Sequence, residues 1–177
     1  LGAVAVVLPP AAPNESWTQE GGNAAKSMGH LALGGQPARV WTATINGGSA
    51  RARLAAAPVI AEGKLFVVDV EAVVHAFDAN TGAKLWQAAV AEGDDNRPSR
   101  FGGGASYDDG KVYATDGLGD VAAFNAADGK LVWRVHPGGP LRGGPTIANG
   151  VVYVETQDNQ LYALDQANGA VNWTAQG

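Results

Sequence analysis

The stretch AFDANTGAKLW at residues 76–86 returns in altered form as AFNAADGKLVW at 123–133 and as ALDQANGAVNW at 163–173. Each copy begins with alanine, has Asp or Asn two residues later and glycine six residues later, and ends with tryptophan. The tryptophans are 133 − 86 = 47 and then 173 − 133 = 40 residues apart. A period of roughly forty residues is typical of repeat proteins built from one small structural unit.

Each repeat contains four short stretches with the composition of β-strands. In the first repeat they are PVIAEG (58–63), KLFVVDV (64–70), AVVHAFD (72–78) and AKLWQAAV (83–90). They are rich in β-branched and aromatic residues, and glycines mark the turns between them. Four antiparallel strands in about forty residues are the content of one propeller blade. The sequence therefore predicts an all-β protein, a β-propeller with four-stranded antiparallel blades.

The repeated stretch has a structural role in this interpretation. The glycine permits the positive φ of a hairpin turn, and the alanine leaves space for the tryptophan. Because a blade exposes both faces of a small sheet, its stability must come from stacking on its neighbours. We expect the three tryptophans to be well covered at equivalent positions, each burying roughly 200 Å² worth several kcal/mol. The predicted docking residues are Trp86, Trp133, Trp173, Ala76, Ala123, Ala163, Gly82, Gly129 and Gly169.

The repeat spacing predicts about four blades, as a segment of a larger propeller. Trp41 closes an atypical first blade, in which Leu31 stands where the other copies have alanine. A propeller stays monomeric when its last blade closes onto its first, so open faces at both ends are expected to favour self-association with a second copy. The expected blades lie near residues 1–45, 46–90, 91–136 and 137–177.

Composition excludes several classes of function. A net charge of −5 and a pI near 5.0 argue against a nucleic-acid partner. The absence of cysteine excludes disulfides, thiolate zinc sites and thiol catalysis. The acidic run EGDDN at 92–96 lacks the spacing of a calcium loop, and the three histidines are isolated from one another in the sequence. The sequence predicts no catalytic, cofactor or metal site and no transmembrane segment, and any export signal or lipid anchor is expected upstream of residue 1.

The connections between blades carry a second pattern. Residues 45–56, 91–104 and 136–144 each join an outer strand to the next inner strand, so they emerge on one face. They hold five of the twelve basic residues, and arginine beside an apolar residue on exposed loops is typical of protein-binding surfaces. The alternative is that the arginines only hold the loops by pairing with Glu92, Asp94 or Asp95. The candidate partner-binding residues are Arg53, Leu54, Arg100, Phe101, Leu141, Arg142 and Gly143.

Two resemblances bear on function. The pattern A-x-[DN]-x-x-[TDN]-G-x-x-x-W, over residues 57–173, resembles the tryptophan-docking motif of quinoprotein-type (PQQ-like repeat) propellers. The longer stretches at 21–33 (GGNAAKSMGHLAL), 53–69 (RLAAAPVIAEGKLFVVD) and 138–165 (GGPLRGGPTIANGVVYVETQDNQLYALD) resemble the outer-membrane assembly factor BamB family, in its alphaproteobacterial form.

The BamB resemblance implies a non-catalytic, eight-bladed periplasmic scaffold at the outer membrane. Such scaffolds are usually lipid-anchored and bind the periplasmic POTRA domains of BamA. In the family a Leu-Arg pair within an LRG loop contacts BamA, and it matches Leu141, Arg142 and Gly143 here. The alternative implied by the first resemblance is the propeller of a PQQ-dependent dehydrogenase, with a quinone and calcium at the ring centre. That family commonly stacks an adjacent cysteine pair on the quinone, and this sequence has no cysteine.

Overall fold

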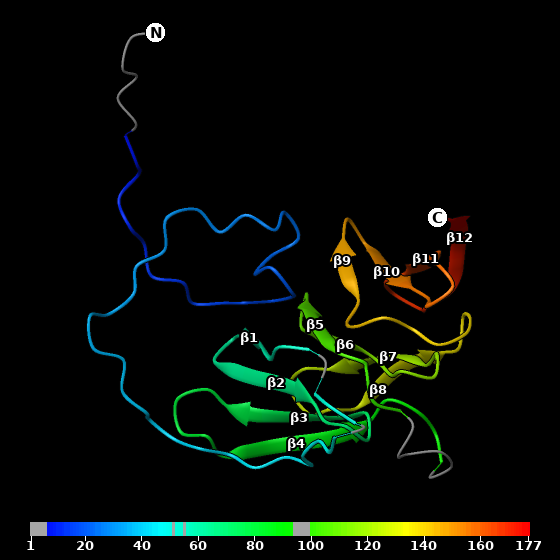
Figure 1. Cartoon of the computed structure of the whole chain (residues 1–177), viewed down its shortest axis with the longest axis horizontal. Coiled ribbons are helices and arrows are strands. Elements are labelled where there is room, and N and C mark those ends of the chain that lie inside the picture. Colours follow the sequence, from blue (N-terminus) through cyan, green and yellow to red (C-terminus); the bar gives the residue numbers. More distant parts are fainter. Residues whose placement is uncertain (1–6, 51, 55, 94–99) are drawn as a thin grey trace, which may run out of the picture.

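In the part of the chain that the structure describes, three four-stranded antiparallel sheets form the body of the protein (Figure 1). The computed structural model describes residues 7–50, 52–54, 56–93 and 100–177. The first sheet consists of β1 (Val59–Ala61), β2 (Lys64–Val68), β3 (Val73–Asp78) and β4 (Lys84–Ala89). The second consists of β5 (Ala105–Asp108), β6 (Lys111–Thr115), β7 (Val121–Asn125) and β8 (Leu131–Val135). The third consists of β9 (Thr146–Ala148), β10 (Val151–Glu155), β11 (Gln160–Asp165) and β12 (Val171–Gln176).

Each sheet is one propeller blade. Its strands are hydrogen-bonded in sequence order, so every connection within a blade is a short hairpin. The first strands of the blades are adjacent in space, β1 to β5 and β5 to β9, and therefore lie innermost. The all-β propeller fold with four-stranded antiparallel blades is confirmed, with one sheet inside each of the expected ranges 46–90, 91–136 and 137–177.

The repeated stretch forms the last hairpin of each blade, as predicted. The alanine of each copy pairs across the sheet with the tryptophan of the same copy, for example Ala76 with Trp86 and Ala123 with Trp133. The strand register shifts directly after each alanine, which is the signature of a β-bulge. The turn glycines have positive φ angles of 73°, 73° and 76° at Gly82, Gly129 and Gly169.

The same glycines have a second role that joins neighbouring blades. A Cβ atom added to Gly129 would lie 2.7 Å from the ring of Trp86, which belongs to the preceding blade. The Trp86 indole Nε1 donates a hydrogen bond to the Ala126 carbonyl at 3.0 Å, within the same turn. Trp133 contacts Gly169 in the same way. Trp86 and Trp133 therefore each dock on the turn of the following blade, and only glycine leaves room for the indole.

Two apolar clusters lie between the blades. One packs Phe66 and Trp86 of the first blade against residues of the second, and the other packs Tyr113 and Trp133 of the second blade against the third. Trp86 and Trp133 retain only 9% and 8% of their exposed area, but Trp173 retains 46%. The expectation of good coverage is thus correct for the first two and wrong for Trp173, because no turn of a following blade packs on it in the described chain.

The expected fourth blade at residues 1–45 is not present as a sheet in its described part. Residues 7–45 contain only isolated bridges and turns, so the described chain has three blades, not about four. The alanine and turn glycine that build the last hairpin elsewhere are absent, and this region is rich in proline. Trp41 nevertheless makes the docking contact: its Nε1 donates to the Ala79 carbonyl at 2.9 Å, and its ring lies over Gly82.

Residues 17–19, which we call the crossing segment, run along the inner strand of all three blades. Trp17 exchanges two backbone hydrogen bonds with Ile60, at 2.7 and 2.8 Å. The next carbonyl accepts from the Tyr107 N–H at 2.6 Å. Gln19 completes the series with its side chain, accepting from the Ile147 N–H at 3.1 Å and donating to the Ile147 carbonyl at 3.2 Å.

The crossing segment contacts equivalent positions of the three repeats. Ile60, Tyr107 and Ile147 each stand 26 residues before the docking tryptophan of their blade (86 − 60, 133 − 107 and 173 − 147). Backbone groups on an open strand edge need hydrogen-bond partners when they are buried. The segment supplies such partners at the same position in three successive blades, and in Figure 1 this part of the chain lies beside β1 and β9.

Gln19→Ala is expected to lower the free energy of unfolding by about 1–3 kcal/mol, because it leaves the buried N–H and C=O of Ile147 without partners. Gln19 is 3% exposed and Ile147 is 2% exposed, so water has poor access to these groups. The matched control is Gln157→Ala, at an exposed position. Urea denaturation followed by tryptophan fluorescence measures both variants, and equal midpoints for the two would contradict the role of Gln19.

Candidate partner-docking face

Two kinds of segment form one face of the propeller, which we call the loop face. They are the turns between the second and third strands of each blade and the long connections from one blade to the next. Both kinds emerge at the same end of the antiparallel strands. Of the sequence-predicted partner-binding residues, Arg53 and Leu54 lie in the segment that leads into β1, and the others lie in the long connections.

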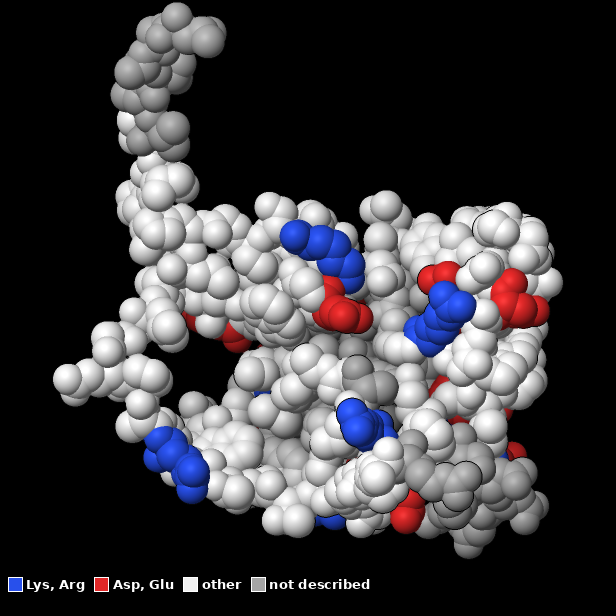
Figure 2. All heavy atoms as spheres, in the orientation of Figure 1, with Lys and Arg blue, Asp and Glu red and all other residues white. Residues whose placement is uncertain are grey.

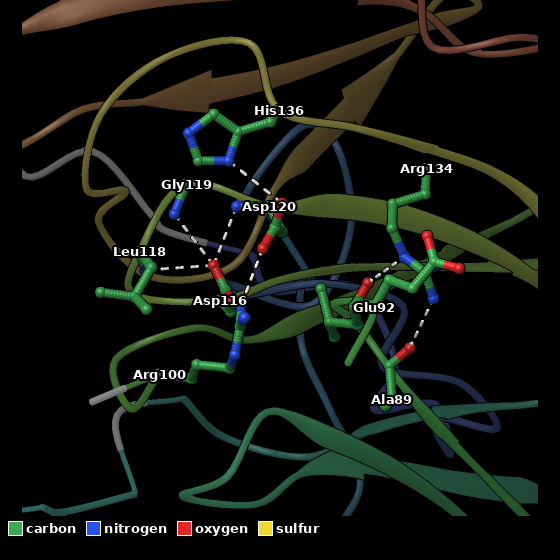
Figure 3. Close-up of polar contacts among 10 residues, drawn as sticks. Ala89, Glu92, Arg100, Asp116, Leu118, Gly119, Asp120, Arg134 and His136 are labelled. Atoms are coloured by element: carbon green, nitrogen blue, oxygen red, sulfur yellow. Dashed lines mark hydrogen bonds and ion pairs between the residues drawn. The ribbon is translucent and has the colours of Figure 1, made fainter. Parts of the chain in front are cut away.

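An ion-pair network ties one connection to the β6–β7 turn (Figure 3). Arg100 Nη1 lies 2.6 Å from Asp116 Oδ2 and 2.8 Å from Asp120 Oδ2. His136 Nδ1 lies 3.1 Å from the other oxygen of Asp120. Asp116 also folds the turn, because its Oδ1 accepts hydrogen bonds of 2.8 to 3.0 Å from three successive backbone N–H groups, those of Leu118, Gly119 and Asp120.

Arg100 is consequently held inside the loop face. The residue is 9% exposed, and the Asp116 side chain is fully buried. Burial alone would lower the pKa of Arg100, but the hydrogen bonds that it donates to Asp116 and Asp120 outweigh this effect and raise the pKa, so the guanidinium stays charged. Its charge is compensated by Asp116 and Asp120, and the side chain is not displayed at the surface, so a partner contact by Arg100 stays a prediction. Its neighbour Phe101 remains 38% exposed.

The structure favours the loop-holding alternative for Arg100. Its partners among the described residues include Asp116 and Asp120. Asp94 and Asp95 lie outside the described residues, as do Arg51, Arg97 and most of the acidic run at 92–96. Glu92 lies 3.9 Å from Arg134, a β8 arginine whose Nε and Nη2 donate to carbonyls at the end of β4. These bonds tie neighbouring blades together.

The Leu141–Arg142–Gly143 loop is fixed by its backbone and by one buried side chain. Leu141 is 2% exposed and packs in the second apolar cluster. The N–H of Arg142 donates to the Glu155 carbonyl at 2.8 Å, and that of Gly143 donates to the Gly102 carbonyl at 3.1 Å. The leucine therefore serves as an internal anchor, and the positive φ of 63° at Gly143 turns the chain back.

Arg142 is the charged group that this loop displays. The residue is exposed, with about half of its side chain accessible. Nη2 donates to the Gln157 carbonyl at 2.7 Å, and Nη1 lies 3.9 Å from Glu155. One edge of the guanidinium is thus oriented by the β10–β11 turn. Arg53 and Leu54, in the segment that leads into β1, are also exposed, Leu54 by 48%.

The carboxylates at the β2–β3 and β6–β7 turns were missed by the sequence reasoning. Asp69, Asp116 and Thr156 each stand 17 residues before the docking tryptophan (86 − 69, 133 − 116 and 173 − 156), and this spacing was a signal that could have identified them. Asp69 Oδ2 lies 2.8 Å from His75 Nε2. Burial alone would raise the pKa of Asp69, but hydrogen bonds from His75 and two backbone N–H groups lower it.

The charged side chains on the face of the molecule shown in Figure 2 are dispersed. In Figure 2 the basic and acidic side chains of the visible face lie in small separate groups, without a continuous basic stripe. Among the described residues, no group of three or more His, Asp or Glu side chains is placed to hold a metal ion. A helix with the length and apolar character needed to cross a membrane is also missing from the part of the chain that the structure describes.

Sequence comparisons agree on one family. The family model for the outer membrane protein assembly factor BamB matches residues 32–99 and 70–177. The chain is 29% identical over 142 residues to BamB of Yersinia pestis, covering 78% of this chain and 36% of that protein. It is 31% identical over 139 residues to BamB of Shewanella oneidensis, covering 75% of this chain and 35% of that protein. The chain spans about a third of the length of these relatives.

Solved structures show the same fold at lower identity. BamB from Moraxella catarrhalis superposes with a TM-score of 0.61 at 23% identity, covering 78% of this chain and 43% of that one. Quinohemoprotein alcohol dehydrogenase from Comamonas testosteroni superposes with a TM-score of 0.68, also at 23% identity, covering 93% of this chain and 28% of that one. At this identity both likenesses indicate only the shared propeller. The family model, which extends from the loop of Trp41 through all three blades, shows that the chain belongs to the BamB family of PQQ-like repeat β-propellers.

Proposed function

We propose that this chain is part of a non-catalytic scaffold of outer-membrane β-barrel assembly, working in the periplasm at the outer membrane. Its membership of the BamB family supports that role. The partner in this proposal is the periplasmic POTRA region of BamA, and the contact is made by the loop face.

The observation that supports the docking proposal is the difference in burial between Leu141 and Arg142, which are neighbours in the Leu141–Arg142–Gly143 loop. The leucine is buried and the backbone is bonded on both sides, while the arginine is exposed and oriented by Gln157. A rigid loop that displays one arginine loses little entropy on binding, which is the usual property of an interface hot spot. Phe101 and Leu54 add exposed apolar area on the neighbouring connections.

We expect Arg142→Ala to weaken binding to the purified BamA periplasmic domains by about tenfold or more, which corresponds to about 1.4 kcal/mol. The matched control is Lys84→Ala, which also removes one exposed positive charge but lies at the start of β4, at the opposite end of the strands. Isothermal titration calorimetry at physiological ionic strength compares the two variants with the parent chain.

Two outcomes would contradict the proposal. Equal affinities for Arg142→Ala and Lys84→Ala would show that the loop face does not carry the contact. Dye-linked alcohol oxidation by the chain after incubation with pyrroloquinoline quinone and calcium would instead support a dehydrogenase.

A further inference from the structure

A hollow of about 290 Å³ lies between the second and third blades. It sits between the β5–β6 turn and the end of β11, at the ends of the strands opposite the loop face. We call it the boundary pocket. Its lining residues are Asp108, Asp109, Lys111, Tyr113, Gly150, Asp165, Gln166 and Ala167.

The hydroxyl of Tyr113 is a buried polar group in this pocket without a hydrogen-bond partner among the described residues. Tyr113 is fully buried, and its ring packs on Trp133 with centroids 5.9 Å apart. The Gln166 amide also lies beside the hydroxyl, but its Nε2 donates to Asp108 Oδ2 at 2.7 Å. An unpaired buried hydroxyl is costly in a folded protein, so a bound group that completes its hydrogen bond would be favourable.

The charge around this hydroxyl is negative. Three aspartates and one lysine line the pocket, a sum of +1 − 3 = −2. Burial raises the pKa of Tyr113, the neighbouring Gln166 amide lowers it, and the negative charges of Asp108 and Asp109 raise it, so that the net shift is upward. The phenol is therefore neutral at pH 7 and lies in a negative potential. Asp165 uses Oδ1 to hold its own turn, accepting from Ala167 and Asn168.

The preceding blade boundary provides an internal comparison, because the repeat places equivalent residues there. Ala61 stands in place of Asp108, Phe66 in place of Tyr113 (both 47 residues earlier), and Ala126 in place of Gln166 (40 residues earlier). These three residues are fully or almost fully buried in the first apolar cluster. At these three places the preceding boundary is closed by apolar side chains, whereas Glu62 and the Tyr107 hydroxyl lie elsewhere at the same boundary. Apolar side chains at these three places are therefore sufficient for two blades to stack.

We propose that the boundary pocket binds an organic cation through a guanidinium or primary ammonium group. The carboxylates of both blades accept its N–H groups, and the Tyr113 oxygen accepts one more at the base of the pocket. A divalent metal ion is a poorer fit, because no group of three acidic or histidine side chains among the described residues is close enough to coordinate one.

Agmatine is a suitable probe, because it carries both cationic groups on a short chain. Titration calorimetry of the chain at constant ionic strength is expected to show saturable binding. Asp109→Asn is expected to weaken that binding by about tenfold, and Tyr113→Phe by about threefold. Because Phe66 fills the equivalent place, Tyr113→Phe is expected to unfold at the same temperature as the parent chain or higher.

The matched control is Glu62→Gln, which removes the carboxylate equivalent to Asp109 at the preceding boundary and is expected to leave agmatine binding unchanged. The peptide acetyl-Gly-Arg-Gly-amide separates two sources of the cation. Binding of the peptide as tightly as agmatine indicates an arginine side chain of a polypeptide, and binding of agmatine alone indicates a free amine.

Three results would overturn the proposal: no saturable heat with either probe, equal binding by the parent and Asp109→Asn, or displacement of agmatine by calcium chloride at matched ionic strength. Because Asp109 is exposed, its variant is expected to fold normally even if Tyr113→Phe does not.

Discussion

Trp133→Ala is expected to lower the free energy of unfolding by about 3–5 kcal/mol, as large aromatic deletions from a core do. The indole is 8% exposed, packs on Tyr113 and donates a hydrogen bond of 3.1 Å from Nε1 to the Gln166 carbonyl. Its removal leaves a cavity between the second and third blades and an unpaired carbonyl. A loss of this size is a large part of the stability of a small domain.

The matched control is Trp173→Ala, which removes the same side chain from the equivalent position of the third blade. Trp173 is 46% exposed, and we expect a cost of about 1–2 kcal/mol. Guanidinium denaturation followed by far-UV circular dichroism measures both variants. Equal losses at the two positions would mean that docking on the next blade contributes little.

Gly129→Ala is expected to cost about 2–5 kcal/mol, for two reasons that can be separated. Gly129 has a φ of 73°, where a side chain adds about 1–2 kcal/mol of strain. The new methyl group would also lie 2.7 Å from the Trp86 ring and displace it from the turn, as overpacking of a core does at about 1–3 kcal/mol.

Gly110→Ala isolates the first cost. Gly110 lies in the same blade with the same φ of 73°, but a Cβ atom there meets no other atom within 4 Å. We expect its loss of stability to be smaller than that of Gly129→Ala by the energy of displacing the indole. Thermal unfolding of the two variants compares them, and a Gly110→Ala variant as unstable as Gly129→Ala would rule out the contact as the cause.

The local features of each blade could be predicted because they depend on residues close in the chain. The alanine, the Asx residue, the glycine and the tryptophan act within one hairpin of eleven residues, and the structure reproduces their pairing at all three copies. The glycine also provides the surface on which the tryptophan of the preceding blade packs. This second function depends on how the blades stack, so no pattern within one repeat predicts it.

The candidate docking face was predicted in part. Its position followed from strand alternation, since connections between blades must emerge on one side. Strand alternation did not predict which of its side chains are buried and which are exposed. Arg100 and Arg142 are both loop arginines beside an apolar residue, yet the first is buried against two aspartates and the second is exposed. The difference arises because the β6–β7 turn contains Asp116, whose carboxylate pairs with Arg100. The β10–β11 turn has the uncharged Thr156 at the equivalent position.

The sequence by itself determined the propeller, because a repeated pattern of short strands and turns records interactions within each blade. Only the tertiary structure decided how many blades form in the described chain and what the non-repetitive residues do. The first expected blade is instead an irregular segment whose crossing residues pair with β1, β5 and β9, from 43 to 128 residues away. Such contacts depend on several strand edges meeting at the centre of a folded ring, and no local sequence pattern encodes where those edges come together.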